Sequence, residues 1–285
     1  MLRRSTIQLL RFHFSFFLLP VYLFALSQVT AVNWTNAVIV FCILHLLVYP
    51  SSNGYNSYMD RDVTPIGGLQ HPMQPTKQLF NVTIIMDVVA VGAAVVVSFV
   101  FALGILLYII ASRAYSGRNI RLKKYPVIGF LTVFIFQGAV VFFITYQAVD
   151  AEQTLNVPII PCIISSLLLG ALYPLTQIYQ HEEDKKDGVH TISYLLGKRN
   201  TFIFSMMLFL AANVLMYILF MQLRQLSSFF IFLGIMCPVV LFFLYWMIRV
   251  WRDERAASFE NSLKMNLLST ICTTIFFVFL VMKYH

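Results

Sequence analysis

The sequence predicts an all-α, polytopic membrane protein with nine transmembrane helices in one bundle. Of its 285 residues, 59% are apolar and only 11% are charged, whereas an ordinary soluble domain has about 25% charged residues. The mean hydropathy is +0.79. The apolar residues form long unbroken blocks instead of alternating strands of about ten residues. These observations exclude a soluble enzyme, a disordered chain and a membrane β-barrel.

Nine apolar blocks are candidate spans, because a helix that crosses a bilayer needs about 20 residues. The third and fourth belong to one block, 79–112. As a single helix, its 34 residues would extend about 51 Å, far beyond a bilayer core of about 30 Å. We therefore expect a break near Gly104. The predicted spans are 12–32, 36–56, 79–97, 102–112, 125–146, 157–179, 201–222, 228–250 and 265–282.

We interpret the first block as a retained helix and not as a secretory signal peptide, because no small-x-small cleavage site follows it. With nine spans and a cytoplasmic N-terminus, 18 of the 20 Lys and Arg residues lie on the cytoplasmic side, in segments 1–11, 57–78, 113–124, 180–200 and 249–264. The positive-inside rule predicts this asymmetry. We expect a multi-pass membrane protein, in the inner membrane if bacterial. Its net charge of +8 then reflects topology and does not indicate nucleic-acid binding.

The acidic residues belong to an internal repeat. Segment 49–60 matches segment 173–184 after a shift of 124 residues. The identical pairs are Tyr49 with Tyr173, Pro50 with Pro174, Tyr55 with Tyr179 and Asp60 with Asp184, and amides exchange between Asn53 and Gln177 and between Asn56 and Gln180. An offset of four helices predicts a single transmembrane domain, residues 1–285, in which helices 1–4 and 5–8 form a parallel pseudo-repeat.

The repeat predicts two oxygen-rich turns on one side of the membrane. Asn56 and Asp60 are four residues apart, as are Gln180 and Asp184, so each pair shares a helix face. Mg²⁺ prefers such oxygen ligands and typically takes one or two carboxylates plus substrate phosphates. Basic residues that can neutralise a polyphosphate are Lys77, Arg113, Arg118, Arg121, Lys123, Lys124 and Lys185. Acidic, basic and apolar groups together predict a lipid diphosphate substrate, although a single acidic cluster is more often a solvated helix cap.

These residues resemble the motifs of the UbiA family of intramembrane prenyltransferases. The family's first motif, N-D-x-x-D-x-D-x-D, corresponds here to 56–64 (NSYMDRDVT), and its second, D-x-x-x-D-x-x-x-G-x-x-T-L, to 180–192 (QHEEDKKDGVHTI). The family's Y-[ST] and L-K stretch corresponds to 115–123. The chain departs from the family at Ser57, Thr64 and Gln180, which stand where the family has Asp, and it lacks the Arg-Pro that often follows the first motif.

The resemblance implies nine helices around a central cavity and an Mg²⁺-dependent prenyltransferase. Its partners would be the lipid bilayer, a polyprenyl diphosphate donor and a hydrophobic acceptor, aromatic or lipid, that nothing in the sequence identifies. The implied catalytic residues are Asp60 and Asp184, and the implied Mg²⁺ ligands are Asn56, Asp60, Asp62, Gln180 and Asp184. The implied diphosphate-binding residues are Lys123, Arg121, Lys77 and Lys185. Further candidates are Asn53, Gln177, Tyr115, Asp187 and the intramembrane Asp87, for which pairing between helices is the alternative.

Two other interpretations stay open at this point. The missing acids permit a catalytically degenerate relative that binds a prenyl lipid or a partner enzyme. A small transporter would place polar residues near mid-membrane on broken helices and would usually show inverted repeats. The repeat here is parallel and its acids lie at the membrane rim, which favours the enzyme over the transporter.

Overall fold

The computed structural model describes residues 2–285, and the regular secondary structure in this range is helical apart from two isolated bridge pairs. Nine helical segments among these residues are long and apolar enough to cross a membrane. They are Arg4–Gln28, Trp34–Asp60, Lys77–Val97, Phe99–Ser116, Pro126–Val149, Ile159–Thr176, Ile192–Gln222, Leu226–Arg252 and Phe259–Tyr284. The predicted fold class is confirmed, and the chain is a multi-pass integral membrane protein.

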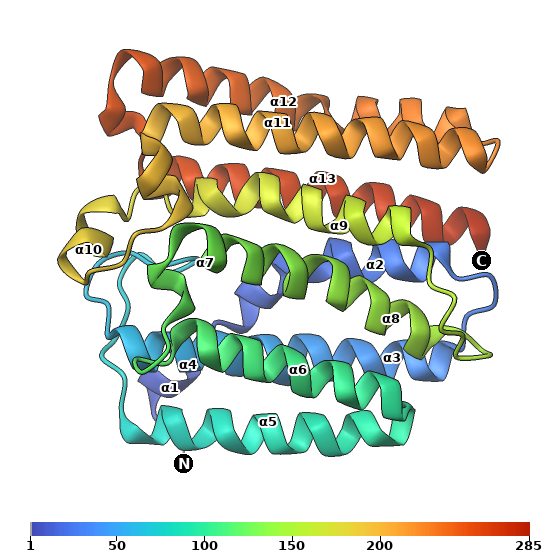
Figure 1. Ribbon diagram of the computed structural model, residues 1–285, viewed down its shortest axis with the longest axis horizontal. Helices are drawn as coiled ribbons and strands as arrows, with labels where there is room; N and C mark the ends of the chain where they lie inside the picture. Colours follow the sequence, from blue (N-terminus) through green and yellow to red (C-terminus); the bar gives the residue numbers. More distant parts are fainter. Residues whose placement is uncertain (1) are drawn as a thin grey trace.

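Several spans change helix type along their length. Figure 1 labels their α-helical parts. The first four spans contain α1 (Arg4–Leu10), η1 (Phe12–Leu18), α2 (Leu19–Gln28), α3 (Trp34–Cys42), η2 (Ile43–Val48), α4 (Tyr49–Asp60), α5 (Lys77–Val97) and α6 (Phe99–Ser116). The elements that follow are η3 (Leu122–Lys124), α7 (Pro126–Val133), η4 (Phe134–Val140), α8 (Val141–Val149), α9 (Ile159–Leu172), η5 (Tyr173–Thr176), α10 (His181–Lys186), α11 (Ile192–Gln222), α12 (Leu226–Arg252), η6 (Glu254–Ala256) and α13 (Phe259–Tyr284). The segments η2 and η4 are π-helical, and the other η elements are 3₁₀ helices.

The two prolines of the predicted repeat both lie where the helix type changes. Pro50 is at the start of α4, directly after the π-helical η2, and Pro174 lies in the 3₁₀ helix η5. Proline has no N–H to donate and its ring crowds the preceding turn, so a wider or tighter turn accommodates it. The second span continues past its proline, whereas the sixth span ends at its proline-containing turn. The pseudo-repeat itself stays a prediction.

The block 79–112 is divided into two spans, as expected, but the prediction that it breaks near Gly104 was wrong. The break lies at Ser98, whose backbone is extended (φ −164°, ψ 156°). The Ser98 hydroxyl accepts a hydrogen bond from Phe101 N at 3.0 Å and donates to Gln147 Oε1 at 2.9 Å. Gly104 instead lies inside α6, where a β-carbon would stand 2.3 Å from Ile144 Cγ2 of α8. This glycine permits close helix packing and does not form a turn.

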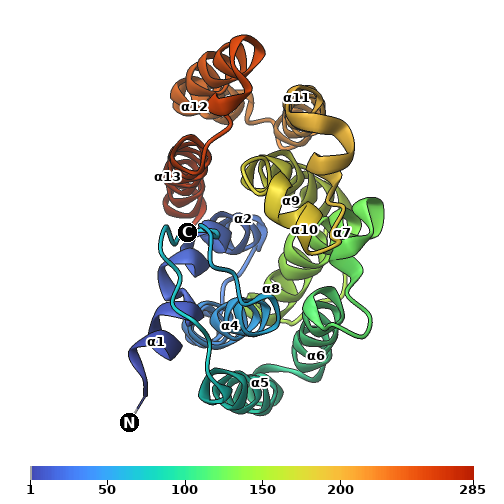
Figure 2. The same cartoon turned by 90° about the vertical axis from the view of Figure 1, so that its left-hand side faces the viewer.

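The helices pack with their long axes roughly aligned. The helix α2 contacts α8 and α13, and α9 contacts α11 (Figures 1 and 2). Phe24 of α2 stacks on Phe277 of α13, with 4.6 Å between ring centroids, and meets Phe142 of α8 edge-on at 5.3 Å. Such aromatic pairs contribute specific geometry in addition to buried area. The hairpins α5–α6 and α11–α12 lie at opposite edges of the bundle (Figure 2).

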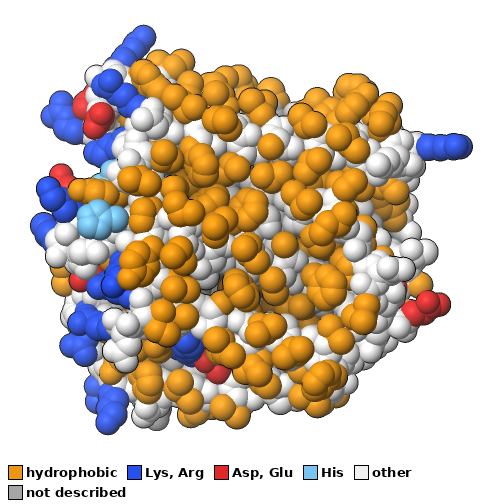
Figure 3. Space-filling model, viewed as in Figure 1, with side chains coloured by type: hydrophobic (Ala, Val, Ile, Leu, Met, Phe, Trp, Pro, Cys, Tyr) orange, Lys and Arg blue, Asp and Glu red, His pale blue; other side chains and the backbone are white. Residues whose placement is uncertain are grey.

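Apolar side chains cover the middle of the visible surface, while most Lys and Arg side chains gather at one end (Figure 3). This end carries Asp60, Asp62 and Asp184 and is called the carboxylate end below. Apolar residues such as Val96, which is 81% exposed, face outward, which in a membrane protein means toward lipid. Which side of the membrane the carboxylate end occupies stays a prediction.

Candidate functional site

A cavity of about 260 Å³ lies at the carboxylate end. Its lining comes from the first span, α4, the loop after α4, α6, η3, α7, η4, α9, η5, α10 and α13. Both acidic motifs contribute to it. The predicted site residues in its lining are Asn53, Asn56, Asp60, Asp62, Tyr115, Lys123, Gln177, Gln180 and Asp184. Segments separated by more than 100 residues therefore meet at one cavity.

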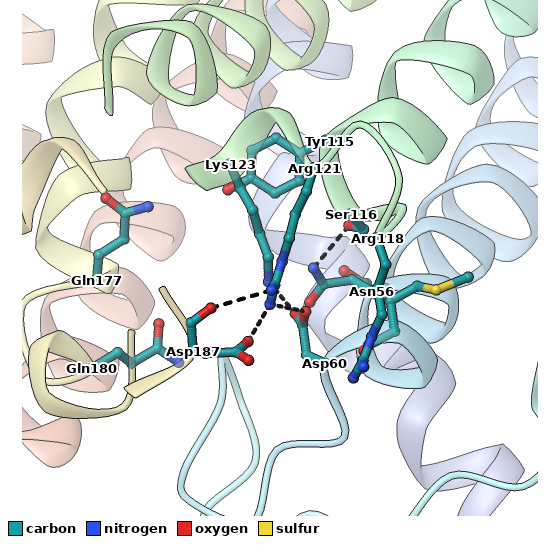
Figure 4. A network of polar contacts seen from close by, with 12 residues as sticks. Asn56, Asp60, Tyr115, Ser116, Arg118, Arg121, Lys123, Gln177, Gln180 and Asp187 are labelled. Carbon is teal, nitrogen blue, oxygen red and sulfur yellow. Dashed lines mark hydrogen bonds and ion pairs between the residues drawn. The ribbon is translucent and has the colours of Figure 1, made fainter. Parts of the chain in front are cut away.

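Asp60, the last residue of α4, is held by cations from another part of the chain. The side chain of Asp60 is only 5% exposed, and Lys123 Nζ donates to its Oδ2. Arg121 Nη2 lies 3.6 Å from Asp60 Oδ1. Figure 4 shows Lys123 and Arg121 extending together from the η3 region toward Asp60. Arg121 adopts φ 49°, a left-handed turn that begins η3. A buried carboxylate paired in this way is neutralised within the fold.

Polar contacts attach the end of α6 and the loop that follows it to α4. Asn56 Nδ2 donates to Ser116 Oγ at 2.9 Å, and Arg118 Nε donates to the carbonyl oxygen of Met59 at 2.9 Å (Figure 4). These bonds fix the loop that carries the two cations over the end of α4. The bonds of Ser116 and Arg118 to α4 thus help to set the position of Lys123 relative to Asp60.

The second acidic turn is held by neutral groups. Gln177 Nε2 donates to the Tyr173 hydroxyl at 2.8 Å, and that hydroxyl is hydrogen-bonded to the Tyr115 hydroxyl. Gln180 Nε2 reaches the carbonyl oxygen of Pro65 at 3.4 Å. Asp184 lies in α10, and its Oδ2 is buried without a hydrogen-bond partner. The turn therefore presents a carboxylate whose charge is not compensated by a hydrogen bond at that oxygen.

Burial changes the electrostatics of the two carboxylates beside Asp60. It raises the pKa of Asp184 to about 7, against the opposing effect of Lys123. It also raises the pKa of Asp62 to about 6, and the nearby charge of Asp60 adds to that shift. Like charges close together in a low-dielectric site disfavour ionisation. A bound cation would relieve this repulsion and hold both groups ionised.

Other predicted residues lie away from the cavity. Lys77 and Lys185 are exposed and do not line it. Asp187 pairs with Arg121, but its side chain is 49% exposed. All three residues are therefore exposed on the surface outside the cavity lining. Their assignment as diphosphate ligands or candidates stays a prediction.

Asp87 lies in an interhelical network. It pairs with Arg113 of α6, and Ser51 Oγ of α4 donates to its Oδ1 at 2.6 Å. Arg113 also donates to the Thr83 hydroxyl at 3.3 Å. The intramembrane charge thus ties α4, α5 and α6 together, which is the paired alternative given above for this residue. It does not line the cavity.

Arg11 lines the cavity and was not among the predicted site residues. Its guanidinium donates to the carbonyl oxygens of Gly67 at 3.1 Å and Asn53 at 3.2 Å, and its buried Nε has no partner. The sequence analysis counted Arg11 among the basic residues that set the membrane orientation, because it directly precedes the first apolar block. One of its partners, Gly67, belongs to the loop that stands in place of the family's Arg-Pro. This loop packs closely on the first span, because a β-carbon on Gly67 would lie 2.7 Å from the Phe14 ring.

The oxygen atoms of the site fit a divalent cation that arrives with a phosphate. Asp60 Oδ1, Asp184 Oδ2 and Gln177 Oε1 are buried acceptors without hydrogen-bond partners. Within residues 2–285, no group of three or more His, Cys, Asp or Glu side chains is close enough to hold a metal ion unaided. Mg²⁺ commonly uses one or two carboxylates and completes its octahedron with water and substrate phosphates. The donor set suits that mode of binding. The individual ligand assignments stay a prediction.

Comparison with known proteins agrees with this architecture. The model of the UbiA prenyltransferase family matches residues 16–269. A UbiA homologue from Archaeoglobus fulgidus, solved with GPP and Mg²⁺, has a TM-score of 0.72 at 18% identity over 98% of this chain and 99% of its own. The apo UbiA homologue from Aeropyrum pernix K1 has a TM-score of 0.70 at 17% identity, covering 94% and 97%.

A digeranylgeranylglyceryl phosphate synthase has a TM-score of 0.62 at 16% identity, over 99% of this chain and 98% of its own. No curated protein sequence matches the chain. At sequence identities this low, the structural matches show only a shared fold. The match to the family model shows the relationship in sequence.

Proposed function

Because the chain belongs to the UbiA prenyltransferase family, we propose that it transfers a prenyl group from a prenyl diphosphate to a hydrophobic acceptor. The observation that carries this proposal is the cavity itself. Asp60 and Asp184, from distant segments, line it together with Lys123 and Arg11. Carboxylates for a cation, fixed cations for phosphate and an apolar interior are the groups that this transfer requires.

In the proposed mechanism the diphosphate of the donor lies at the carboxylate end. Asp60, Asp62 and Asp184, with Asn56 and Gln180, would hold Mg²⁺, which supplies Lewis-acid stabilisation of the leaving diphosphate. Lys123 and Arg11 add positive charge from the protein. When the allylic C–O bond breaks, its electron pair leaves with the diphosphate, whose new charge these residues stabilise.

The rest of the cavity receives the prenyl chain. Aromatic side chains in its lining include Phe17, Tyr49, Tyr108, Tyr115 and Phe136. Ring faces favour a nearby cation, so they stabilise the allylic carbocation. The apolar wall also excludes water, which would otherwise capture the cation. An electron-rich acceptor then forms the new bond to the allylic carbon and loses a proton. By the positive-inside rule, the carboxylate end faces the cytoplasm.

The test uses the purified full-length protein in nanodiscs that contain host lipid extract as the source of acceptor. Radiolabelled geranyl diphosphate and Mg²⁺ are added, and label in a new lipid product is measured. We expect Asp60→Asn and Asp184→Asn each to lower transfer by about 100-fold or more, as for the loss of other charge-stabilising groups. The matched control is Asp253→Asn, which changes an exposed aspartate that pairs with Arg255 on the surface.

Unchanged transfer in both cavity variants would exclude the mechanism. If the wild-type protein binds geranyl diphosphate with Mg²⁺ but yields no product, the chain is a binding relative without catalysis. The acceptor is identified separately, by comparing lipid extracts of the host with and without the gene and finding which prenylated compound disappears.

A further inference from the structure

Gln137 is an uncharged polar residue deep in the cavity. It lies in the π-helical η4, in the middle of the fifth span, and it lines the cavity beside Phe136. The span starts with Pro126 at the carboxylate end (Figure 1). Gln137 is eleven residues further along, which corresponds to about 16 Å of helix. The residue is therefore placed well below the carboxylates, inside the membrane-spanning part of the bundle.

Most of the hydrogen-bonding capacity of Gln137 is unused. Its Nε2 donates to the Tyr108 hydroxyl of α6 at 3.4 Å, and within the described part of the chain its Oε1 accepts no hydrogen bond. This oxygen is not enclosed by protein atoms, and the residue is half-buried and lines the cavity. An amide has two N–H donors and an oxygen that can accept twice. The free oxygen is thus available to a molecule inside the cavity.

A hydroxyl group from α9 is inserted into the turn that carries Gln137. Ser166 Oγ donates to the carbonyl oxygen of Phe134 at 2.7 Å and accepts from Ala139 N at 2.9 Å. A side chain inserted in this way replaces a direct backbone hydrogen bond and widens the turn, and such π turns are frequent at functional sites. Gly138 permits the approach, because a β-carbon there would lie 2.4 Å from Ser166 Cα. The α9 helix therefore fixes the backbone on both sides of Gln137.

A seam of uncharged polar side chains between α4 and α6 leads from the carboxylate end toward Gln137. Its pairs, from the carboxylate end inward, are Asn56 with Ser116, Ser52 with Ser112 and Tyr49 with Tyr108. The first two pairs are hydrogen-bonded at 2.9 and 2.6 Å, and the third has 5.9 Å between ring centroids. All six residues line the cavity. From Ser116 to Tyr108 the seam is about 12 Å long, so one wall of the cavity is polar down to Gln137.

The prenyl donor cannot pair with Gln137. In the proposed function its diphosphate lies at the carboxylate end, and its chain contains only carbon and hydrogen and so has no hydrogen-bond donor. An apolar wall for this chain is present elsewhere in the lining, where η1 contributes Phe17 and Leu18 and α9 contributes Leu169 and Leu172. Water is excluded from the cavity while the allylic cation exists. The remaining partner for Gln137 is the acceptor.

We infer that Gln137 binds a hydroxyl group of the acceptor, which donates a hydrogen bond to Gln137 Oε1. This inference rests on the proposed function, because it concerns the acceptor part of the same cavity. No residue of the seam or of η4 is charged, so the group that enters here is neutral. Ser166 is a positioning residue, because it holds the turn and does not line the cavity. A phenol and an aliphatic alcohol share this chemistry, and the experiment below distinguishes them.

The binding test uses the full-length protein in phosphatidylcholine nanodiscs with Mg²⁺ and geranyl thiolodiphosphate, a donor analogue that resists ionisation. The photoreactive probes are para-hydroxybenzophenone and para-methoxybenzophenone, and crosslinked peptides are mapped by mass spectrometry. We expect the hydroxyl probe to label α4, α6 or η4 about fivefold more than the ether, as for one additional hydrogen bond. The stronger competitor of para-hexylphenol and decanol identifies the acceptor as a phenol or an aliphatic alcohol. Competition by neither would overturn the inference.

Two pairs of variants test the assigned residues. Gln137→Leu has a side chain of similar size without the amide, and both probes should label it equally. Gln28→Leu is the matched control, because Gln28 also makes one side-chain hydrogen bond, to Ser27 Oγ at 3.2 Å, in a membrane span but outside the cavity. Ser166→Ala should also lower the hydroxyl preference. Ser165→Ala should not, because the buried Ser165 Oγ has no hydrogen-bond partner.

Labelling requires no bond cleavage, so its result is independent of the transfer assay. A hydroxyl preference that depends on Gln137 in a protein without transfer activity would retain the binding site and exclude the proposed function. If an active protein is labelled equally by both probes, or if the preference is unchanged in Gln137→Leu, the inference is overturned and the proposed function stands. Size-exclusion elution checks the fold of each variant, and the comparison of probes on the wild-type protein requires no variant.

Discussion

The two acidic turns of the cavity have the same spacing of amide and aspartate, yet they differ in structure and in charge compensation. Asp60 ends the long helical segment of the second span and pairs with Lys123, with Arg121 close by. Asp184 lies in the six-residue α10, and its Oδ2 is buried without a partner. Among the described residues, no ion pair to Asp184 is found.

In the proposed function, this difference would give the two carboxylates different tasks before a substrate binds. The charge of Asp60 is compensated by the protein, so this residue also holds the loop after α6 in place. Asp184 has no ion pair among the described residues, and burial raises its pKa to about 7 although Lys123 and the Thr191 hydroxyl oppose the shift. In the proposed function, a bound cation would compensate its charge. Separating the two roles requires stability and ligand binding to be measured in the same variants.

The largest expected effect on stability is at Asp60. Asp60→Asn leaves Lys123 partly buried without its partner, while Arg121 keeps its pair with Asp187. Breaking a buried pair such as that of Asp60 with Lys123 costs about 4 kcal/mol of unfolding free energy. Asp184→Asn removes a buried carboxylate that has no ion pair and should leave stability equal or higher. Chemical unfolding in detergent measures both. In the double variant Asp60→Asn/Lys123→Met, part of the loss should be regained, and equal stability of the two single variants would contradict the comparison.

Asp87 provides a purely structural reference for Asp60. Asp87→Asn removes the charged partner of Arg113 in the contact between α4, α5 and α6 and should cost about 3 kcal/mol of unfolding free energy, since Arg113 keeps its hydrogen bonds to Thr83 and Ser51. The concentrations of Mg²⁺ and donor that give half-maximal transfer should not change, because Asp87 does not line the cavity. A shift in the Mg²⁺ requirement would place Asp87 in the functional site.

Restoring the family's aspartate at residue 180 would test how the second acidic turn binds a cation. Gln180→Asp adds a carboxylate four residues before Asp184, and affinity for hard cations rises with the number of charged ligands. We expect the Mg²⁺ concentration for half-maximal binding of geranyl diphosphate to fall on the order of tenfold. Gln180→Glu tests the geometry with the same charge on a longer side chain. If the Mg²⁺ concentration for half-maximal binding is unchanged in both variants, residue 180 is not an Mg²⁺ ligand.

The smallest effect is expected at Asp187. It pairs with Arg121 but its side chain is 49% exposed, and exposed pairs contribute less than about 1 kcal/mol. Asp187→Asn should therefore change the unfolding free energy by about 0.5 kcal/mol or less and leave Asp60 with Lys123. Comparison of unfolding in low and high salt checks this, because an exposed pair is screened by salt. If Asp187→Asn lowered the unfolding free energy as much as Asp60→Asn, both carboxylates would be needed to hold Arg121 in place.

Much of the site follows from local sequence patterns. The repeat around Asp60 and Asp184 predicted that two distant turns belong together, and the structure places both in one cavity lining. Local spacing could not predict Arg11, because its partners are the carbonyl oxygens of Gly67 and Asn53, more than 40 residues away. It also could not show that Lys77 is exposed and does not line the cavity, since exposure depends on how α5 packs.

The sequence by itself determined that the chain crosses the membrane in nine helices and that its scarce acids recur at one offset. Apolar block length and charge position are local quantities, and the bilayer acts on each span separately. Only the tertiary structure decided that the long block breaks at Ser98 and not at Gly104, that Asp60 is paired while Asp184 is not, and that Ser166 of α9 is inserted into the turn that carries Gln137. Each of these depends on which side chains of other helices come within hydrogen-bonding or van der Waals distance, and sequence spacing along one helix does not contain that information.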